Sequence, residues 1–188
     1  MNKIRSFIAI EIPDGIKKDL FEIQERLKKA GADIGWTRPE GIHFTLKFLG
    51  EIEEEKLVNI QKAIEQATKE IPDFILWVGG IGVFPNTKSP RVIWIGIKGE
   101  GENLKTLQES IERETEKIGF KKEGRNFSPH LTLGRVRSQK NRDALTKYLE
   151  EFEKIELGSF NVKEVLLMKS ELRPKGAVYT QLWKATLK

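Results

Sequence analysis

The chain has 188 residues, which is enough for one domain with a substantial buried core. Its formal net charge of +5 and its sequence pI near 9.3 favour a phosphate-bearing partner, and the absence of cysteine excludes a disulfide framework, a thiol nucleophile and a zinc ribbon. The apolar runs are too short for a signal peptide or a membrane span, so we expect a cytoplasmic protein that does not bind membranes.

Hydrophobic periodicity predicts the elements of the first half of the chain. An apolar run at 5–12 is typical of a buried strand, and apolar residues spaced three to four apart predict a helix at 16–30, which Gly31 ends. The next predicted elements are a strand at 42–49, a helix at 53–70 and two strands joined by a turn, at 74–84 and 91–97.

The second half repeats this order after a helix at 104–118. A strand that begins at His130 is followed by a helix at 142–154, a strand at 160–170, a turn at 173–176 and a last strand at 177–187. The segments 43–98 and 130–188 therefore share the order strand, helix, strand, strand, which indicates an internal repeat. We expect a single α+β domain (1–188) of two similar lobes with antiparallel sheets, because turn-joined strands cluster after the helices.

The two histidines of the chain, His43 and His130, each open a His-x-Thr-Leu frame, whose threonines are Thr45 and Thr132. In an extended strand the histidine and the threonine of each frame share one face, about 6.5 to 7 Å apart, while the intervening apolar side chains share the other. Phe48 is expected to extend that apolar face. If the two strands lie close together, two imidazoles and two hydroxyls converge on one site.

This set of groups suits phosphodiester chemistry. Imidazole titrates near neutral pH, so one ring can act as a base while the other acts as an acid. An attacking oxygen must lose a proton and a leaving oxygen must gain one, and threonine hydroxyls can donate to the non-bridging oxygens of the phosphate. A single histidine on a strand is more often structural, but the matched frames favour catalysis for His43, Thr45, His130 and Thr132.

Two cations are candidates for contact with the substrate phosphate. Arg135, five residues after His130, has the forked geometry that matches phosphate oxygens. Lys47 falls on the face of His43 and Thr45 if the strand alternates strictly, and a solvated surface position is the alternative. Other basic and aromatic side chains that could border the site are Lys121, Lys122, Arg125, Trp36, Phe84 and Phe127, although core packing is the more common role of the aromatic ones.

Competing kinds of site lack their signatures. No acidic residue stands at a short regular offset from either histidine to complete a metal site, and a G-x-S-x-G elbow is missing. The glycines at 79–82 are not followed by the Lys-Ser/Thr ending of a phosphate-binding loop. We therefore expect neither a metal nor another cofactor.

The paired frames, together with the run Phe-Ser-Pro-His-Leu-Thr-Leu-Gly-Arg at 127–135, resemble the 2H phosphoesterases, and in particular the RNA 2′,3′-cyclic phosphodiesterases, also called 2′-5′ RNA ligases. The resemblance includes the opening strand and the Thr-Leu-Lys-Phe-Leu-Gly run after His43. It implies two pseudo-symmetric lobes, each an antiparallel sheet with helices on its outer face, and a cleft between them.

The same resemblance implies an activity and roles for the residues. The expected reaction is metal-independent opening of a ribose 2′,3′-cyclic phosphate to a 2′-phosphomonoester, with reversible 2′-5′ ligation when a ribose hydroxyl replaces water. His43 would be the proton donor, His130 the proton acceptor, and Thr45, Thr132 and Arg135 would hold the phosphate. The residues alone leave the acid and base roles interchangeable. The expected partner is the end of a tRNA or another RNA, bound by a monomeric enzyme.

The basic charge and the Lys/Glu composition lead to two further expectations. A non-catalytic module that binds RNA ends would use the same basic cleft and is the alternative function. The chain contains 23 Lys and 23 Glu but only 5 Asp, a bias reported for hyperthermophile proteins, so the composition favours a thermophilic source.

Overall fold

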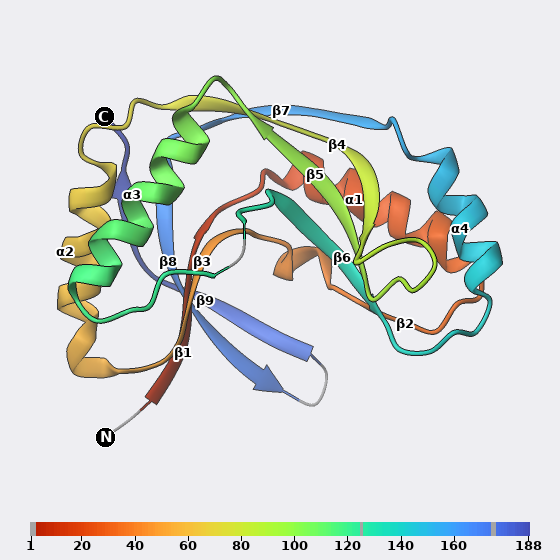
Figure 1. Cartoon of the computed structure of the whole chain (residues 1–188), viewed down its shortest axis with the longest axis horizontal. Coiled ribbons are helices and arrows are strands. Elements are labelled where there is room, and N and C mark those ends of the chain that lie inside the picture. Colours follow the sequence, from red (N-terminus) through yellow and green to blue (C-terminus); the bar gives the residue numbers. More distant parts are fainter. Residues whose placement is uncertain (1–2, 125, 174–175) are drawn as a thin grey trace.

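The computed structural model describes residues 3–124, 126–173 and 176–188 (Figure 1). In chain order, its elements are β1 (Lys3–Ile10), α1 (Asp14–Lys28), β2 (Ile34–Trp36), β3 (Phe44–Glu53), α2 (Leu57–Thr68), β4 (Phe74–Phe84), β5 (Val92–Gly99), α3 (Asn103–Lys117), β6 (His130–Val136), α4 (Arg142–Glu151), β7 (Glu156–Val162), β8 (Glu164–Arg173) and β9 (Gly176–Thr186). Two short 3-10 helices, Pro39–Gly41 and Glu54–Lys56, precede β3 and α2.

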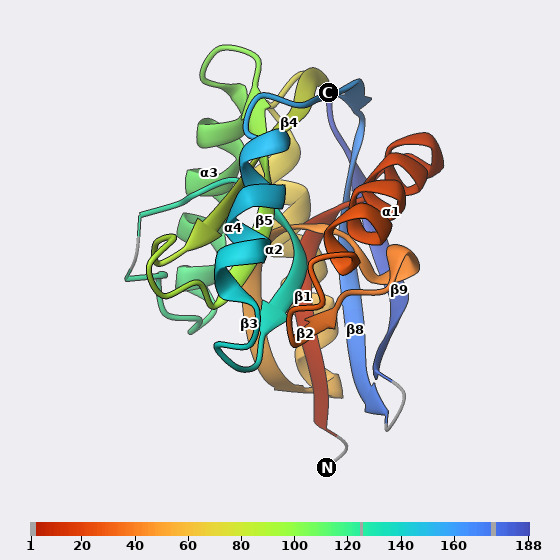
Figure 2. The ribbon, with the colours of Figure 1, turned by 90° about the vertical axis from the view of Figure 1, so that its right-hand side faces the viewer.

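These strands form two antiparallel sheets. The four-stranded sheet has the order β3-β1-β8-β9, and the five-stranded sheet has the order β2-β6-β5-β4-β7. Helices α2 and α3 pack together beside the four-stranded sheet, and α1 and α4 pack together at the other end of the molecule (Figures 1 and 2). The expected α+β architecture of two antiparallel sheets with helices is confirmed.

The two halves of the chain exchange strands. The β4–β5 hairpin of the first half pairs with β6, which carries the second histidine frame. The β8–β9 hairpin of the second half pairs with β1, which in turn pairs with β3 of the first frame. Each sheet is therefore built from both halves of the sequence, and the repeat boundaries at 43–98 and 130–188 stay a prediction.

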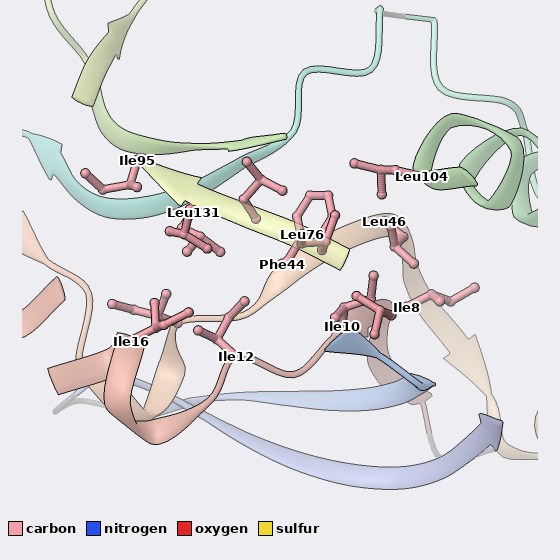
Figure 3. Close-up of a cluster of buried hydrophobic side chains, with 14 of the residues drawn as sticks. Ile8, Ile10, Ile12, Ile16, Phe44, Leu46, Leu76, Ile95, Leu104 and Leu131 are labelled. Atoms are coloured by element: carbon pink, nitrogen blue, oxygen red, sulfur yellow. The ribbon is translucent and has the colours of Figure 1, made fainter. Parts of the chain in front are cut away.

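A continuous apolar core fixes the two sheets relative to each other. Ile8 and Ile10 of β1 and Phe44 of β3 face Leu76 and Leu131 of the five-stranded sheet, and all are nearly inaccessible to solvent (Figure 3). Phe44, Leu76 and Leu131 alternate with half-exposed or exposed neighbours along their strands, whereas the neighbours of Ile8 and Ile10 in the central strand β1 are also buried. The opposite faces of the sheets are left to form a site.

Two of the predicted elements need correction. The prediction of a single strand at 160–170 is wrong. The chain leaves the five-stranded sheet at the end of β7 and enters the four-stranded sheet at the start of β8, with Lys163 between the two strands. Both pieces have strand-like composition, so the change of partner leaves no local signal. The helix expected at 53–70 begins only at Leu57, since β3 continues to Glu53.

Some sequence predictions fall on residues that the structure does not describe. Arg125, a candidate for the border of the site, lies outside the described residues, as do residues 174 and 175 of the turn predicted at 173–176. Within the described ranges, none of the helices has both the length and the apolar character needed to cross a bilayer.

Candidate active site

One cleft, of about 460 Å³, is lined by residues of both sheets. The edge that carries the first frame supplies His43 and Thr45, and β6 supplies His130, Thr132 and Arg135. Five of the six side chains that the sequence singled out therefore meet in one place. A larger groove of about 980 Å³ over β4, β5 and β7 contains none of them.

Each frame ends in a β-bulge at its leucine. In β3, Thr45 lies opposite Ala9 and Lys47 opposite Ile8, so Leu46 is an extra residue without a partner on β1. The pairing of β6 with β5 has the same irregularity, with Leu133 as the extra residue. A bulge reverses the alternation of side chains along its strand, so the residues after each frame face the side opposite to the one that simple alternation predicts.

The prediction that Lys47 shares the face of His43 and Thr45 is wrong for this reason. Lys47 is only 3% exposed, forms an ion pair with Glu112 of α3, and donates a hydrogen bond to the backbone carbonyl of Lys121 at 2.8 Å. It does not line the cleft, so it has no place in contact with the substrate phosphate. Its role is to satisfy a buried carboxylate between β3 and α3.

The same bulges bring Arg135 and Phe48 to the cleft. Both stand five residues after a histidine, and both line the cleft. Phe48 is 64% exposed, with its ring centroid 6.1 Å from that of Phe7, so its expected place on the buried face is wrong. The two frames thus present a cation on one side of the cleft and an exposed aromatic ring on the other.

The two imidazoles are held in the same way. Nδ1 of His43 lies 3.2 Å from the carbonyl oxygen of Gly41, and Nδ1 of His130 lies 2.6 Å from that of Ser128. A carbonyl oxygen can only accept a hydrogen bond, so Nδ1 carries the hydrogen in both rings. Nε2 is therefore the nitrogen at which each ring can gain or lose a proton.

A carboxylate that sequence reasoning did not select lies beside one of these rings. Oε2 of Glu11 is 3.4 Å from Nε2 of His43, and Oε1 of Glu11 pairs with Lys17. Partial burial is the largest single influence and would raise the pKa of Glu11, but hydrogen bonds and charge from His43 and Lys17 together lower this pKa to about 2. Among the described residues, His130 has no carboxylate partner.

Aromatic rings form the walls around the histidines. The edge of Tyr179 meets His43 with ring centroids 5.3 Å apart, and Phe84 meets His130 in the same manner at 5.1 Å. Of the other aromatic candidates, Phe127 packs against Phe44 at 6.0 Å, and Trp36 is partly buried against the core. These last two rings serve packing. In the described ranges, no three His, Cys, Asp or Glu side chains are grouped as metal ligands.

The chain is similar to known phosphoesterases over nearly its whole length. The model of the family described as LigT like Phosphoesterase matches it twice, at residues 10–94 and 95–179. A protein of Methanothermobacter thermautotrophicus named RNA 2′,3′-cyclic phosphodiesterase is 39% identical over 96% of this chain and 97% of its own length. A protein of Thermotoga maritima with the same name is 35% identical over 96% of this chain and 94% of its own.

Solved structures show the same fold. A crystal structure of a Thermus thermophilus protein superposes with a TM-score of 0.83 at 28% identity, and covers 98% of both chains. The structure of E. coli LigT complexed with 3′-AMP superposes with a TM-score of 0.79 at 24% identity and covers 99% of both chains.

Proposed function

Because the chain belongs to the LigT-like phosphoesterase family, we propose that it hydrolyses RNA 2′,3′-cyclic phosphate ends to 2′-phosphomonoesters. The observation that carries this proposal is the meeting of both His-x-Thr-Leu frames in one cleft, with both imidazoles held through Nδ1. Two imidazoles that can exchange protons through Nε2 provide one base and one acid, so both proton transfers can take place without a metal ion.

The reaction can be written with these residues. Nε2 of His130 accepts a proton from water as the water oxygen forms a bond to phosphorus. The bond between phosphorus and O3′ breaks, and Nε2 of His43 gives its proton to O3′, which leaves a 2′-phosphate. Thr45 and Thr132 donate hydrogen bonds to the non-bridging oxygens, and Arg135 provides the charge that stabilises the transition state.

The position of Glu11 supports His43 as the proton donor. Oε2 of Glu11 lies 3.4 Å from Nε2 of His43, where it can accept a hydrogen that this nitrogen carries, and no such group is paired with His130 among the described residues. The two rings, which are equivalent in the sequence, are therefore unequal in their electrostatic surroundings. We assign the role of base to His130, the ring without a carboxylate.

The same site can also join two RNA ends. If the 5′-hydroxyl of another RNA takes the place of water, its attack on phosphorus joins the two RNAs through a 2′-5′ phosphodiester bond. Attack of the 3′-hydroxyl on the same phosphorus releases the 5′-hydroxyl and restores the cyclic phosphate. We propose RNA ends of tRNA or other RNA as the substrate, and a cytoplasmic monomer as the working enzyme.

The test uses RNA that ends in a 2′,3′-cyclic phosphate, incubated with protein in excess chelator. We expect turnover to persist in chelator and to fall by about a hundredfold to ten-thousandfold in His43→Ala and in His130→Ala, because each removes one proton-transfer group. The product is identified as a 2′-phosphate by its resistance to a 3′-phosphatase.

Lys47→Met serves as the control variant, since Lys47 faces away from the cleft. The folded Lys47→Met protein should hydrolyse the cyclic phosphate at the same rate as the unchanged protein. Full activity in either alanine variant would contradict the proposal. Tight binding of the RNA end without turnover would favour the non-catalytic binding module instead.

A further inference from the structure

A second pocket, of about 450 Å³, adjoins the catalytic cleft. Arg135 lines both cavities. The second pocket also contains Arg91, which precedes β5, and Arg137, which follows β6. The rest of its lining is uncharged and includes Ser89 and Ser138, so three arginines and no carboxylate line this pocket.

The three arginines of this pocket have no carboxylate partner among the residues that the structure describes. Within the described part of the chain, Arg91, Arg135 and Arg137 form no ion pair, whereas Arg142 nearby contacts Asp143 at 3.4 Å. Like charges that are placed together without counter-charges repel one another, and an anionic ligand would offset this repulsion. The charge of the pocket therefore points to a phosphate-bearing occupant.

The strand geometry places Arg135 and Arg137 on one face of the sheet. Arg137 follows Arg135 by two residues and continues the ladder, with its N–H donating to the carbonyl of Asp33 at 2.8 Å. Residues two apart on a strand share a face at a spacing of about 6.5 to 7 Å. The guanidinium of Arg137 lies over Gly35 of β2, where Nε and Nη2 are 3.0 Å from the position that a Cβ would take. The glycine leaves room for this side chain to lie along the sheet.

We propose that Arg91 and Arg137 bind the internucleotide phosphodiester that precedes the terminal nucleotide of the RNA, while Arg135 contacts the cyclic phosphate in the cleft. The inference rests on the proposed function. Guanidinium forks match pairs of phosphate oxygens, and Arg135 lines both cavities, so neighbouring phosphates of one RNA chain can occupy the two sites. The pocket makes the enzyme selective for an RNA chain over a mononucleotide.

The test compares adenosine 2′,3′-cyclic phosphate with a short oligoribonucleotide that ends in the same group. In the double variant Arg91→Ala/Arg137→Ala, we expect KM for the oligonucleotide to rise by about tenfold for each arginine, because each substitution removes a charge-assisted hydrogen bond. The slope of log affinity against log salt should fall by about 0.7 for each phosphate that the variant no longer neutralises. For the mononucleotide, kcat and KM should stay unchanged.

Two further variants sharpen the comparison. Lys62→Ala/Lys69→Ala removes the same charge from two exposed positions, in α2 and directly after it, away from the pocket, and should leave the kinetics of both substrates unchanged. Gly35→Ala keeps every charge but displaces the guanidinium of Arg137, so KM for the oligonucleotide should rise by less than in Arg91→Ala/Arg137→Ala.

Three results would overturn the inference: an unchanged KM for the oligonucleotide, an equal loss on both substrates, or an equal loss in the α2 control. Failure of the proposed function looks different. In that case the unchanged protein would turn over neither substrate. Anisotropy with a fluorescent oligonucleotide ending in a phosphate would still reveal whether Arg91→Ala/Arg137→Ala weakens binding.

Discussion

At the scale of single residues, the two histidine frames are alike in sequence but differ in what surrounds them. The fourth residue after each histidine is buried: it is Lys47 in the first frame and Gly134 in the second. The fifth residue lies at the cleft: it is Phe48 in the first frame and Arg135 in the second. A carboxylate, Glu11, is placed beside the first histidine alone among the described residues. These differences make an asymmetric site from a repeated motif.

We expect Glu11→Gln to lower activity on the alkaline side of the pH optimum and to leave the acid side unchanged. The substitution removes the negative charge beside Nε2 of His43, the proposed proton donor, whereas His130 keeps its surroundings. The measurement is the pH profile of kcat/KM for Glu11→Gln and for the unchanged protein. A uniform loss at every pH would show that Glu11 only supports the local structure.

The stability of the fold should depend on Glu11 in acid. Its pKa is lowered from 4.5 to about 2 in the folded protein, so the folded state favours the ionised form. The resulting stabilisation is present above pH 4.5 and is lost as the pH falls toward 2. Urea unfolding measured between pH 4.5 and pH 2 should show a smaller loss of unfolding free energy in Glu11→Gln than in the unchanged protein. An equal dependence of this free energy on pH in both proteins would show that ionisation of Glu11 does not stabilise the fold.

At the scale of secondary-structure elements, the bulges decide which side chains reach the cleft. The bulge at Leu133 is held by Gln24 of α1, which is 1% exposed. Its amide donates to the carbonyl of Leu133 at 2.8 Å and to that of Thr37 at 2.7 Å, and Thr37 N–H also donates to Leu133. Helix α1 thereby fixes the point on β6 at which Arg135 turns to the cleft.

We expect Gln24→Leu to destabilise the protein by about 1 to 3 kcal/mol, because the carbonyl of Thr37 loses its buried donor. The bulge should also become less well fixed, so kcat/KM should fall through misplacement of Arg135. Denaturant unfolding and steady-state kinetics measure the two effects. Gln66→Leu, at an exposed position of α2, is the control and should change neither quantity.

At the scale of the whole molecule, neither half of the chain contains a complete sheet. The β4–β5 hairpin of the first half needs β6, and β8 of the second half needs β1. Strands without their partners would expose apolar faces and unpaired backbone groups. The exchange also places one histidine frame on each sheet, so the cleft exists only when both halves are folded together.

We therefore expect fragments 1–101 and 102–188 to be unfolded separately and to regain structure and activity when they are mixed. The break falls in an exposed turn, which avoids damage to a strand. Circular dichroism and cyclic phosphate hydrolysis would follow the reassembly. A cooperative unfolding transition in either isolated fragment would contradict the expectation.

Local patterns in the sequence determined much of this protein. Apolar residues that recur every two residues, or every three to four, predicted the bounds of β4, α1 and α3 to within a few residues. Such patterns depend only on which face of an element is buried. The matched frames singled out the histidines and threonines that line the cleft, since their spacing is a property of one strand.

Only the tertiary structure decided how strands pair and where their alternation breaks. The bulges at Leu46 and Leu133, the burial of Lys47 and the approach of Glu11 to His43 all depend on residues far apart in the sequence. The change of sheet at Lys163 is of the same kind. Strand register is set by contacts between distant segments, and a shift of one residue reverses the face of every side chain that follows.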